Sequence, residues 1–234
     1  MTGPRPDISA LLAASPLCRG MPADAVASLA RHADLVDRSP GDELCVEGTP
    51  AVAMFLVVRG VVKLVRALET GRDVIVELIG RGDVLGEAAL ADGGLYDARA
   101  VCLHPSTILV LPRSAVLGFL ACHPDAVRNL VAAMHESVIR AHSRVEDMAV
   151  FGVRQRIARF LIRLADWAGR GEGGRVVVPV ALSRQDLAAL VGTTMETAIR
   201  VMSGLRREGL VQAARCGVVL VDRAALEQVA RAQS

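Results

Sequence analysis

Short apolar or alternating segments, separated by glycine-containing turns, follow one another along residues 32–113. The segments read AMFLVV, VVKLVRAL, DVIVELI and TILVLP, and the turns read VRG, ETGRD, GRGD and DGG. Segments of this length with turn residues between them are typical of strands in an all-β roll or barrel. Two earlier stretches, DISALLAA and DAVASLARHA, predict short helices. The first part of the chain is therefore predicted to be a β-roll preceded by helices.

A long helix with one apolar stripe is predicted over residues 124–150, because apolar residues recur there every three or four positions. The stripe consists of Val127, Leu130, Met134, Val138, Ala141, Val145 and Met148. Such a stripe can pack on the helix's own β-domain or pair with the same helix of a second chain. Because a stripe of about seven turns is longer than one small domain needs, we favour a parallel two-helix dimer interface.

Residues 153–234 return to helical patterns and contain two closely spaced helices. The segments are a helix (VRQRIARFLIRLADWAG), a strand-like VVVPV, the two helices and a closing hairpin, VQAARCGVVLV. Ser183 and Asp186 approximate a capping box for the first helix. Gly192 suits a left-handed turn, and Thr194 can cap the second helix. The expected buried positions are Leu187, Leu190 and Val191, then Ala198, Val201, Met202 and Leu205. This pattern predicts a helix-turn-helix.

Glu196 and Arg200 share one face near the start of the second helix, because they are four residues apart. In a helix-turn-helix that end enters the major groove, where Arg can bond to guanine and Glu can accept from cytosine N4. An ordinary surface ion pair is the alternative. Thr194, Met195, Thr197, Ile199 and Ser203 accompany the pair as candidate DNA contacts, and Arg184, Gln185, Arg206 and Arg207 suit phosphates.

Charge supports a partner rich in phosphate. Residues 153–234 carry 13 Lys and Arg against seven Asp and Glu, whereas residues 1–152 carry 14 against 18. A basic C-terminal third on an acidic remainder favours nucleic acid, and so double-stranded DNA, as its partner.

Other classes of protein are not expected from the sequence. No apolar run approaches the ~20 residues of a membrane helix and no signal-peptide pattern is present, so a soluble, cytoplasmic protein is expected. The five cysteines are scattered, which does not suit a disulfide framework or a zinc site. They are Cys18, Cys45, Cys102, Cys122 and Cys216. We find no nucleophile–base pair and no P-loop, so an enzyme is not expected and no metal is assigned.

The segment SRQDLAALVGTTMETAIRVMSGLRREGLV closely resembles the helix-turn-helix of the Crp/Fnr superfamily of bacterial transcription regulators. GDELCVEG, VVRGVVKLV and GDVLGEAAL extend the resemblance over nearly the whole chain. The resemblance implies an α+β fold: a cyclic-nucleotide-binding-like β-roll (1–123), a dimerisation helix (124–152) and a winged helix-turn-helix (153–234). It also implies a homodimer on a palindromic DNA site, with RNA polymerase as a further partner, and VQAARCGVVLV as the wing.

Base preference follows from the same resemblance. Glu196 and Arg200 fall on the family's base-reading Glu and Arg. The cyclic-AMP receptor branch has an arginine just before that Glu, whereas Met195 here resembles the Fnr and Dnr/Nnr branches, which favours a TTGA-like half-site. The Fnr branch has a serine where this chain has Ile199, which could touch a thymine methyl or relax that position.

The effector loop, GDVLGEAALADGGLYDARA, keeps only part of the family's cyclic-AMP site. Gly86 and Glu87 match, but the phosphate-binding Arg-Ser pair falls on Tyr96 and Asp97. Tyr cannot replace a buried phosphate-binding Arg, and Asp97 would repel the anion. Arg99 is a poor substitute because its direction is not fixed by the pattern, so cyclic AMP is not expected.

The second half of the nucleotide site, a Thr-Ser pair on the dimer helix, falls on Ala141 and His142. The loop instead resembles the Dnr/Nnr branch, whose members respond to nitrogen oxides, in some cases through heme. Heme, nitric oxide or redox input is therefore one expectation for the unidentified effector. Candidate heme ligands are His32, His104, His123, His135 and His142. The alternatives are a constitutive DNA-binding regulator whose β-roll binds no ligand, or a cyclic-nucleotide-responsive regulator with an altered pocket.

Overall fold

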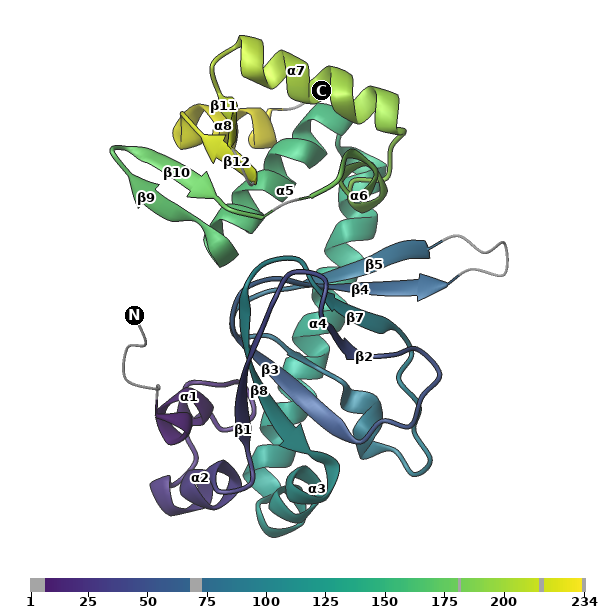
Figure 1. Cartoon of the computed structure of the whole chain (residues 1–234), viewed down its shortest axis with the longest axis vertical. Coiled ribbons are helices and arrows are strands. Elements are labelled where there is room, and N and C mark those ends of the chain that lie inside the picture. Colours follow the sequence, from purple (N-terminus) through teal and green to yellow (C-terminus); the bar gives the residue numbers. More distant parts are fainter. Residues whose placement is uncertain (1–6, 68–72, 181, 215–216, 233–234) are drawn as a thin grey trace. The chain divides into compact units, whose positions relative to one another are not determined.

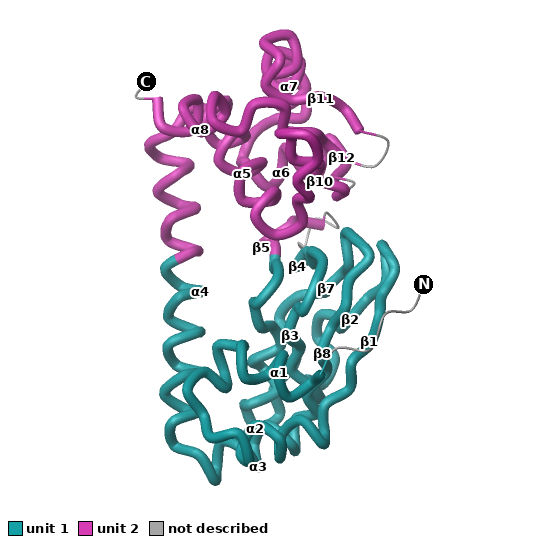
Figure 2. Tube along the Cα trace, turned by 90° about the vertical axis from the view of Figure 1, so that its left-hand side faces the viewer, with its two compact units in different colours: residues 1–66, 79–139 teal, residues 67–78, 140–234 magenta. Residues whose placement is uncertain are grey.

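The structure, a computed structural model, describes residues 7–67, 73–180, 182–214 and 217–232 (Figure 1). The chain divides into two compact units, residues 1–66 with 79–139 (unit 1) and residues 67–78 with 140–234 (unit 2) (Figure 2). The long helix α4 (Pro124–Val150) contributes residues to both units. It ends at the place the sequence predicted, and two residues separate it from the next helix.

Unit 1 begins with α1 (Ile8–Ala13) and α2 (Ala23–Ala30) and continues as short strands (Figure 1). The strands are β1 (Asp34–Arg38), β2 (Glu43–Cys45), β3 (Ala53–Arg59), β4 (Val62–Ala67), β5 (Asp73–Ile79), β6 (Val84–Leu85), β7 (Arg99–Cys102) and β8 (Ser106–Pro112). Of these, β5 falls in residues 67–78 of unit 2 except for its last residue, Ile79. They form two four-stranded sheets with the orders β1-β8-β3-β6 and β2-β7-β4-β5. A single-turn helix, η1 (Glu87–Leu90), follows β6, and α3 (Arg113–Cys122) follows β8. The predicted β-roll is confirmed.

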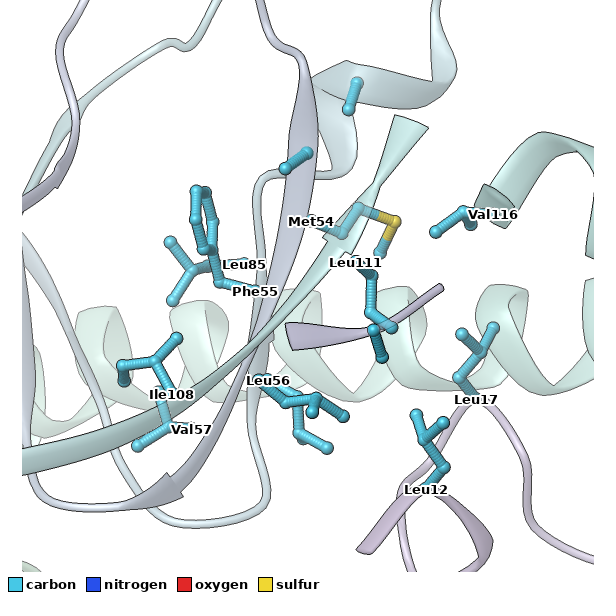
Figure 3. Close-up of a cluster of buried hydrophobic side chains, with 14 of the residues drawn as sticks. Leu12, Leu17, Met54, Phe55, Leu56, Val57, Leu85, Ile108, Leu111 and Val116 are labelled. Atoms are coloured by element: carbon cyan, nitrogen blue, oxygen red, sulfur yellow. The ribbon is translucent and has the colours of Figure 1, made fainter. Parts of the chain in front are cut away.

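The core of unit 1 gathers the inward-facing residues of both sheets and of the helices (Figure 3). Met54, Leu56 and Val57 of β3 and Ile108 of β8 are buried in it. The helices add Leu12, Leu29, Val116, Phe119, Ala126 and Leu130. Strands β3 and β8 are the two inner strands of their sheet and both contribute side chains to this core. Their continuous apolar runs suit such buried strands.

Unit 2 contains the end of α4 and a helical domain with a small sheet. Its further elements are α5 (Val153–Ala168), β9 (Arg170–Glu172), β10 (Arg175–Val178), α6 (Arg184–Leu190), α7 (Met195–Arg207), β11 (Val211–Ala214), β12 (Gly217–Leu220) and α8 (Arg223–Arg231). The sheet has the order β11-β12-β10-β9. Ile157 and Leu164 of α5, Leu205 of α7 and Leu226 of α8 are fully buried, and α5 packs on both α7 and α8.

Several elements were not named by the sequence prediction. The hairpin VQAARCGVVLV is not the closing element, because α8 follows it, with Asp222 accepting the N–H of Ala225 as its cap. Helices α3 and η1 and the short strands β1, β2, β6 and β9 were also not named. The tip of the hairpin, with Arg215 and Cys216, lies outside the described residues. In the described part of the chain, no helix is both long and apolar enough to cross a membrane.

Candidate functional site

Helix α6 begins with the capping box that the sequence predicted. The Oγ atom of Ser183 accepts the backbone N–H of Asp186 at 2.9 Å, and the carboxylate of Asp186 accepts the N–H of Ser183 at 3.2 Å. Two of the unpaired N–H groups at the start of the helix are thereby satisfied. Leu187 and Val191 are buried as expected, whereas Leu190 is half-buried.

The turn between α6 and α7 depends on Gly192. This residue has φ +65°, in the left-handed region where a side chain is costly. A Cβ atom at this position would lie 3.2 Å from the Cε atom of Met148, at the end of α4. The backbone conformation therefore favours glycine here, and a larger residue would also press on the end of the Met148 side chain.

Helix α7 follows with Thr194 as its cap, because the hydroxyl of Thr194 accepts the N–H of Thr197 at 3.2 Å. Ala198 and Leu205 are buried, and Val201 and Met202 are half-buried, so this face of α7 packs into unit 2. The predicted helix-turn-helix is confirmed, together with both predicted caps.

The outer face of α7 carries the predicted base-reading residues. Met195 is 53% exposed, and Glu196, Arg200 and Ser203 are exposed as well. Over the described residues Glu196 and Arg200 form no ion pair, so the alternative of a surface salt bridge is not realised. Both side chains are thus available to a ligand.

The predicted phosphate-binding residues lie around the same helices. Arg184, Gln185, Arg206 and Arg207 are exposed. Arg184, Ser203 and Arg206 line one cavity of about 350 Å³, together with the half-buried Ile199. Thr197 is half-buried and within 3.1 Å of the hydroxyl of Thr194. The structure therefore brings the predicted DNA contacts onto α7 and the beginning of α6.

Arg156 of α5 also contacts the helix-turn-helix, although the sequence analysis did not single it out. Its Nε atom donates to the carbonyl of Val191 at 2.8 Å and its Nη2 atom to the carbonyl of Gly192 at 3.1 Å. Its Nη1 atom donates to the carbonyls of Phe151 at 2.9 Å and Met148 at 3.2 Å. No local sequence signal marks such a residue, because two of its partners lie 35 and 36 positions away.

The apolar stripe predicted on α4 is mostly exposed to solvent. Val127, Met134, Val138, Val145 and Met148 are exposed, and Ala141 is half-buried. Leu130 corrects the prediction: it is only 7% exposed and belongs to the core of unit 1. Val131 is 59% exposed instead. The α4 seam is therefore Val127, Val131, Met134, Val138, Ala141, Val145 and Met148.

The α4 seam follows a strict seven-residue repeat. Val131, Val138 and Val145 are seven apart, and so are Val127, Met134, Ala141 and Met148. The second set lies three positions after the first, which is the a/d spacing of a coiled coil. Leu130 does not fit this spacing, which agrees with its burial inside its own unit.

The effector loop is held by hydrogen bonds within unit 1. Gly86 has φ +89°, and a Cβ atom there would lie 2.9 Å from the carbonyl oxygen of Ala53. Tyr96 is only 5% exposed, and its hydroxyl donates to the carbonyl of Ala53 at 2.9 Å. The hydroxyl oxygen of Tyr96 also accepts the N–H of Ala53 at 3.1 Å. Burial raises the pKa of Tyr96. Its side chain is therefore a neutral group built into the core.

Charged residues of the loop are directed to other partners. Arg99 forms an ion pair with Glu43 at 3.0 Å, so its guanidinium is engaged by a carboxylate. Arg113 of α3 donates to the carbonyls of Ala89 at 2.7 Å and Ala91 at 3.3 Å. Asp97 is exposed, and Glu87 is half-buried at the start of η1. In unit 2, Ala141 is half-buried and His142 exposed.

The five candidate heme ligands are dispersed. His32 and His123 line one cavity of about 420 Å³ together with Cys122, beside α2 and α3. His104 is buried, and its Nδ1 atom lies 2.8 Å from the carbonyl oxygen of Pro105. His135 and His142 are exposed on α4. The structure thus brings only two of these histidines to a common cavity.

Family models match both units of this arrangement. Residues 35–123 match a cyclic nucleotide-binding domain, and residues 155–229 match a Crp-like helix-turn-helix domain. The fold and the exposed face of α7 therefore define a DNA-binding transcription regulator with a cyclic-nucleotide-binding-type β-roll.

Relatives of known identity share this organisation. The cyclic AMP receptor protein of Thermus thermophilus is 30% identical over 190 residues, covering 81% of this chain and 85% of that protein. The CRP-like cAMP-activated global transcriptional regulator of Mycobacterium tuberculosis is 25% identical over 221 residues, covering 94% and 99%. A crystal structure of a CRP-family transcriptional regulator from Thermus thermophilus matches with a TM-score of 0.71 at 25% identity, covering 85% of this chain and 97% of that one. This chain belongs to the Crp/Fnr family of transcription regulators, and it is not an enzyme.

Proposed function

We propose that the protein acts as a homodimer that reads a palindromic DNA site with α7 of each subunit. The free pair Glu196 and Arg200 on the outer face of α7 is the observation that carries this proposal. Arg can donate two bonds to the O6 and N7 atoms of guanine, and Glu can accept from the N4 group of cytosine. Two copies of α7 would then read half-sites about one helical turn apart.

The α4 seam supports the dimer. It leaves valine and methionine side chains exposed along one line of the helix, with valine at every a position. β-branched residues at a favour two parallel strands in a coiled coil. Pairing of two α4 helices would remove this apolar surface from water, which stabilises association.

The half-site is proposed to be TTGA-like. Glu196 and Arg200 supply contacts for a G·C pair, and Met195 leaves no cation for a further guanine at that position. Ile199 is half-buried beside them and can contact a thymine methyl group. The resemblance of this helix to the Fnr and Dnr/Nnr branches points in the same direction. RNA polymerase is the further partner proposed for the DNA-bound dimer.

Fluorescence anisotropy with a labelled TTGA-N6-TCAA duplex and a scrambled duplex tests the base reading. Arg200→Ala is expected to weaken binding to the specific duplex about 10- to 100-fold, since a bidentate base contact contributes about 1–3 kcal/mol of discrimination. Arg206→Ala is the matched control, because an arginine on phosphate contributes equally to both duplexes. Its removal is expected to weaken binding to both and to reduce the salt slope by about one. Equal losses on the two duplexes for Arg200→Ala would refute the assignment.

Cyclic AMP is not the proposed effector, although the two relatives described above carry cAMP in their names. At the two phosphate-binding positions this chain has a buried, neutral Tyr96 and an exposed Asp97, and Arg99 is paired with Glu43. Neither of these two positions supplies the cation that the phosphate would need. Anisotropy titrations with and without cyclic AMP test this, and a requirement for the nucleotide would overturn it.

The second candidate is a regulator that occupies DNA without any effector. The bonds of Tyr96 to Ala53 and of Arg113 to the loop favour it, because they fix the loop to residues of its own unit. Specific binding by the purified, ligand-free dimer would support this candidate. A heme-dependent sensor of nitric oxide would instead show a Soret band after reconstitution and would require heme for specific binding.

A further inference from the structure

The guanidinium of Arg156 joins two places that are far apart in the sequence. On one side it bonds to carbonyls at the end of α4 and in the connection to α5, those of Met148 and Phe151. On the other side it bonds to carbonyls at the end of α6 and in the turn, those of Val191 and Gly192. One planar group therefore connects the exit of the long helix to the turn before α7.

Two of these carbonyls, those of Met148 in the last turn of α4 and of Val191 at the C-cap of α6, are ones that helices leave unpaired. The last carbonyls of an α-helix have no intrahelical donor and carry the negative end of the helix dipole. Arg156 places one positive charge at the ends of α4 and α6 together. Within the described residues its guanidinium forms no ion pair, and the acceptors that it contacts are backbone carbonyls.

A second contact joins the same two segments without Arg156. The side chain of Met148 lies against Gly192, where a Cβ atom would be 3.2 Å from Cε and 3.3 Å from Sδ. Met148 is also the last residue of the α4 seam. The turn before α7 thus rests on the helix that carries the proposed dimer interface.

We propose that Arg156 is a positioning residue for DNA reading, which fixes the turn before α7 to the end of α4. Because Thr194 caps α7 directly after this turn, the direction of its first residues depends on where the turn is held. Met195, Glu196 and Arg200 then reach the groove in one orientation in each subunit. This inference rests on the proposed function and adds the residue through which α4 sets the reading geometry.

The guanidinium geometry is the essential property in this proposal. An ammonium group carries the same charge but lacks the planar fork that reaches four carbonyls in two directions. Arg156→Lys is therefore expected to behave like Arg156→Ala rather than like the wild type. If the charge acted only on DNA phosphates, the lysine variant would bind as well as the wild type.

The test compares specific and scrambled duplexes by anisotropy for wild type, Arg156→Ala, Arg156→Lys and Arg223→Ala. Arg223→Ala is the matched control, because, like Arg156→Ala, it removes one positive charge and the bonds of one arginine within unit 2. The partners of Arg223 are Asp166 and Glu227. If the reading orientation falls to about a tenth of the population, the Kd for the specific duplex rises about tenfold. The Kd for the scrambled duplex is expected to stay within twofold of wild type, and the protein is expected to remain a dimer.

Hydrogen exchange gives a readout that a general loss of stability would not reproduce. The amides of residues 193–197 are expected to exchange faster in both Arg156 variants, while amides in the middle of α5 keep their protection. Should Arg156→Ala fail to fold, Arg156→Lys and Met148→Ala carry the same test. An unchanged preference for the specific duplex, or full rescue by lysine, would overturn the role of Arg156. A wild-type protein without any preference would instead refute the proposed function.

Discussion

The hydroxyl of Tyr96 is bonded twice to the backbone of Ala53, as a donor to its carbonyl at 2.9 Å and as an acceptor from its N–H at 3.1 Å. Both residues are buried, so Tyr96→Phe would leave polar backbone atoms of Ala53 without this partner. We expect the free energy of unfolding to fall by about 1–3 kcal/mol. Urea denaturation measures it, and specific DNA affinity under native conditions is the control. An unchanged unfolding midpoint would show that water replaces the hydroxyl.

Gly192→Ala tests the turn of the helix-turn-helix. A positive φ costs an alanine about 1–2 kcal/mol, and the new Cβ would also press on Met148. Gly173→Ala is the matched control, because Gly173 has φ +55° with no atom within 4 Å of its Cβ position. We expect Gly192→Ala to be the more destabilising of the two in thermal or urea unfolding. Equal losses would mean that Met148 moves aside without cost.

Val138→Glu tests the α4 seam. A carboxylate at an a position would have to be buried beside its symmetry mate, which opposes pairing by desolvation and repulsion. We expect the variant to sediment as a monomer at micromolar concentration and to lose specific DNA binding. Ile139→Glu, one residue further on, is the matched control, since Ile139 is equally exposed but lies outside the seam. A monomer from Ile139→Glu and a dimer from Val138→Glu would place the interface elsewhere on α4.

Two buried thiols make stability depend on alkaline pH. Burial raises the pKa of Cys18 and of Cys45 from 9.0 to about 11. A folded-state pKa above the unfolded value stabilises the native protein below about pH 9, and this contribution is lost as the pH rises toward about 11. Urea denaturation between pH 8 and pH 11 is expected to show the decline. The double variant Cys18→Ala and Cys45→Ala should decline less steeply, and an equal slope would contradict the prediction.

Local signals carried the prediction of the helix-turn-helix. Ser183, Asp186 and Thr194 bond to backbone groups three residues away, so their capping roles can be predicted from the residues next to them. Gly192 is recognisable for the same reason, because a left-handed turn is a property of one residue. The β-roll was likewise predictable from the length of its apolar segments and the glycines between them.

Contacts between distant segments were not predictable. Leu130 and Val131 are neighbours on one helix, and only the position of the core decides that Leu130 is buried while Val131 is exposed. The bonds of Tyr96 to Ala53 and of Arg156 to Gly192 span 43 and 36 residues. Helix α8 was missed because its short apolar pattern follows a strand closely and its cap, Asp222, resembles a turn residue.

Helix α4 runs without interruption for 27 residues, and its exposed side chains repeat every seven. Each residue inserted into an α-helix turns all later side chains by about 100°, whereas seven residues return them almost to their starting direction. A chain that pairs through Val131, Val138 and Val145 can therefore change the length of α4 only in whole heptads. Arg156 and the turn at Gly192 depend on the same count, because both are attached at Met148. Length variation among related regulators is expected to keep this phase, because α4 would set the direction of the turn before α7 as well as carry the proposed interface.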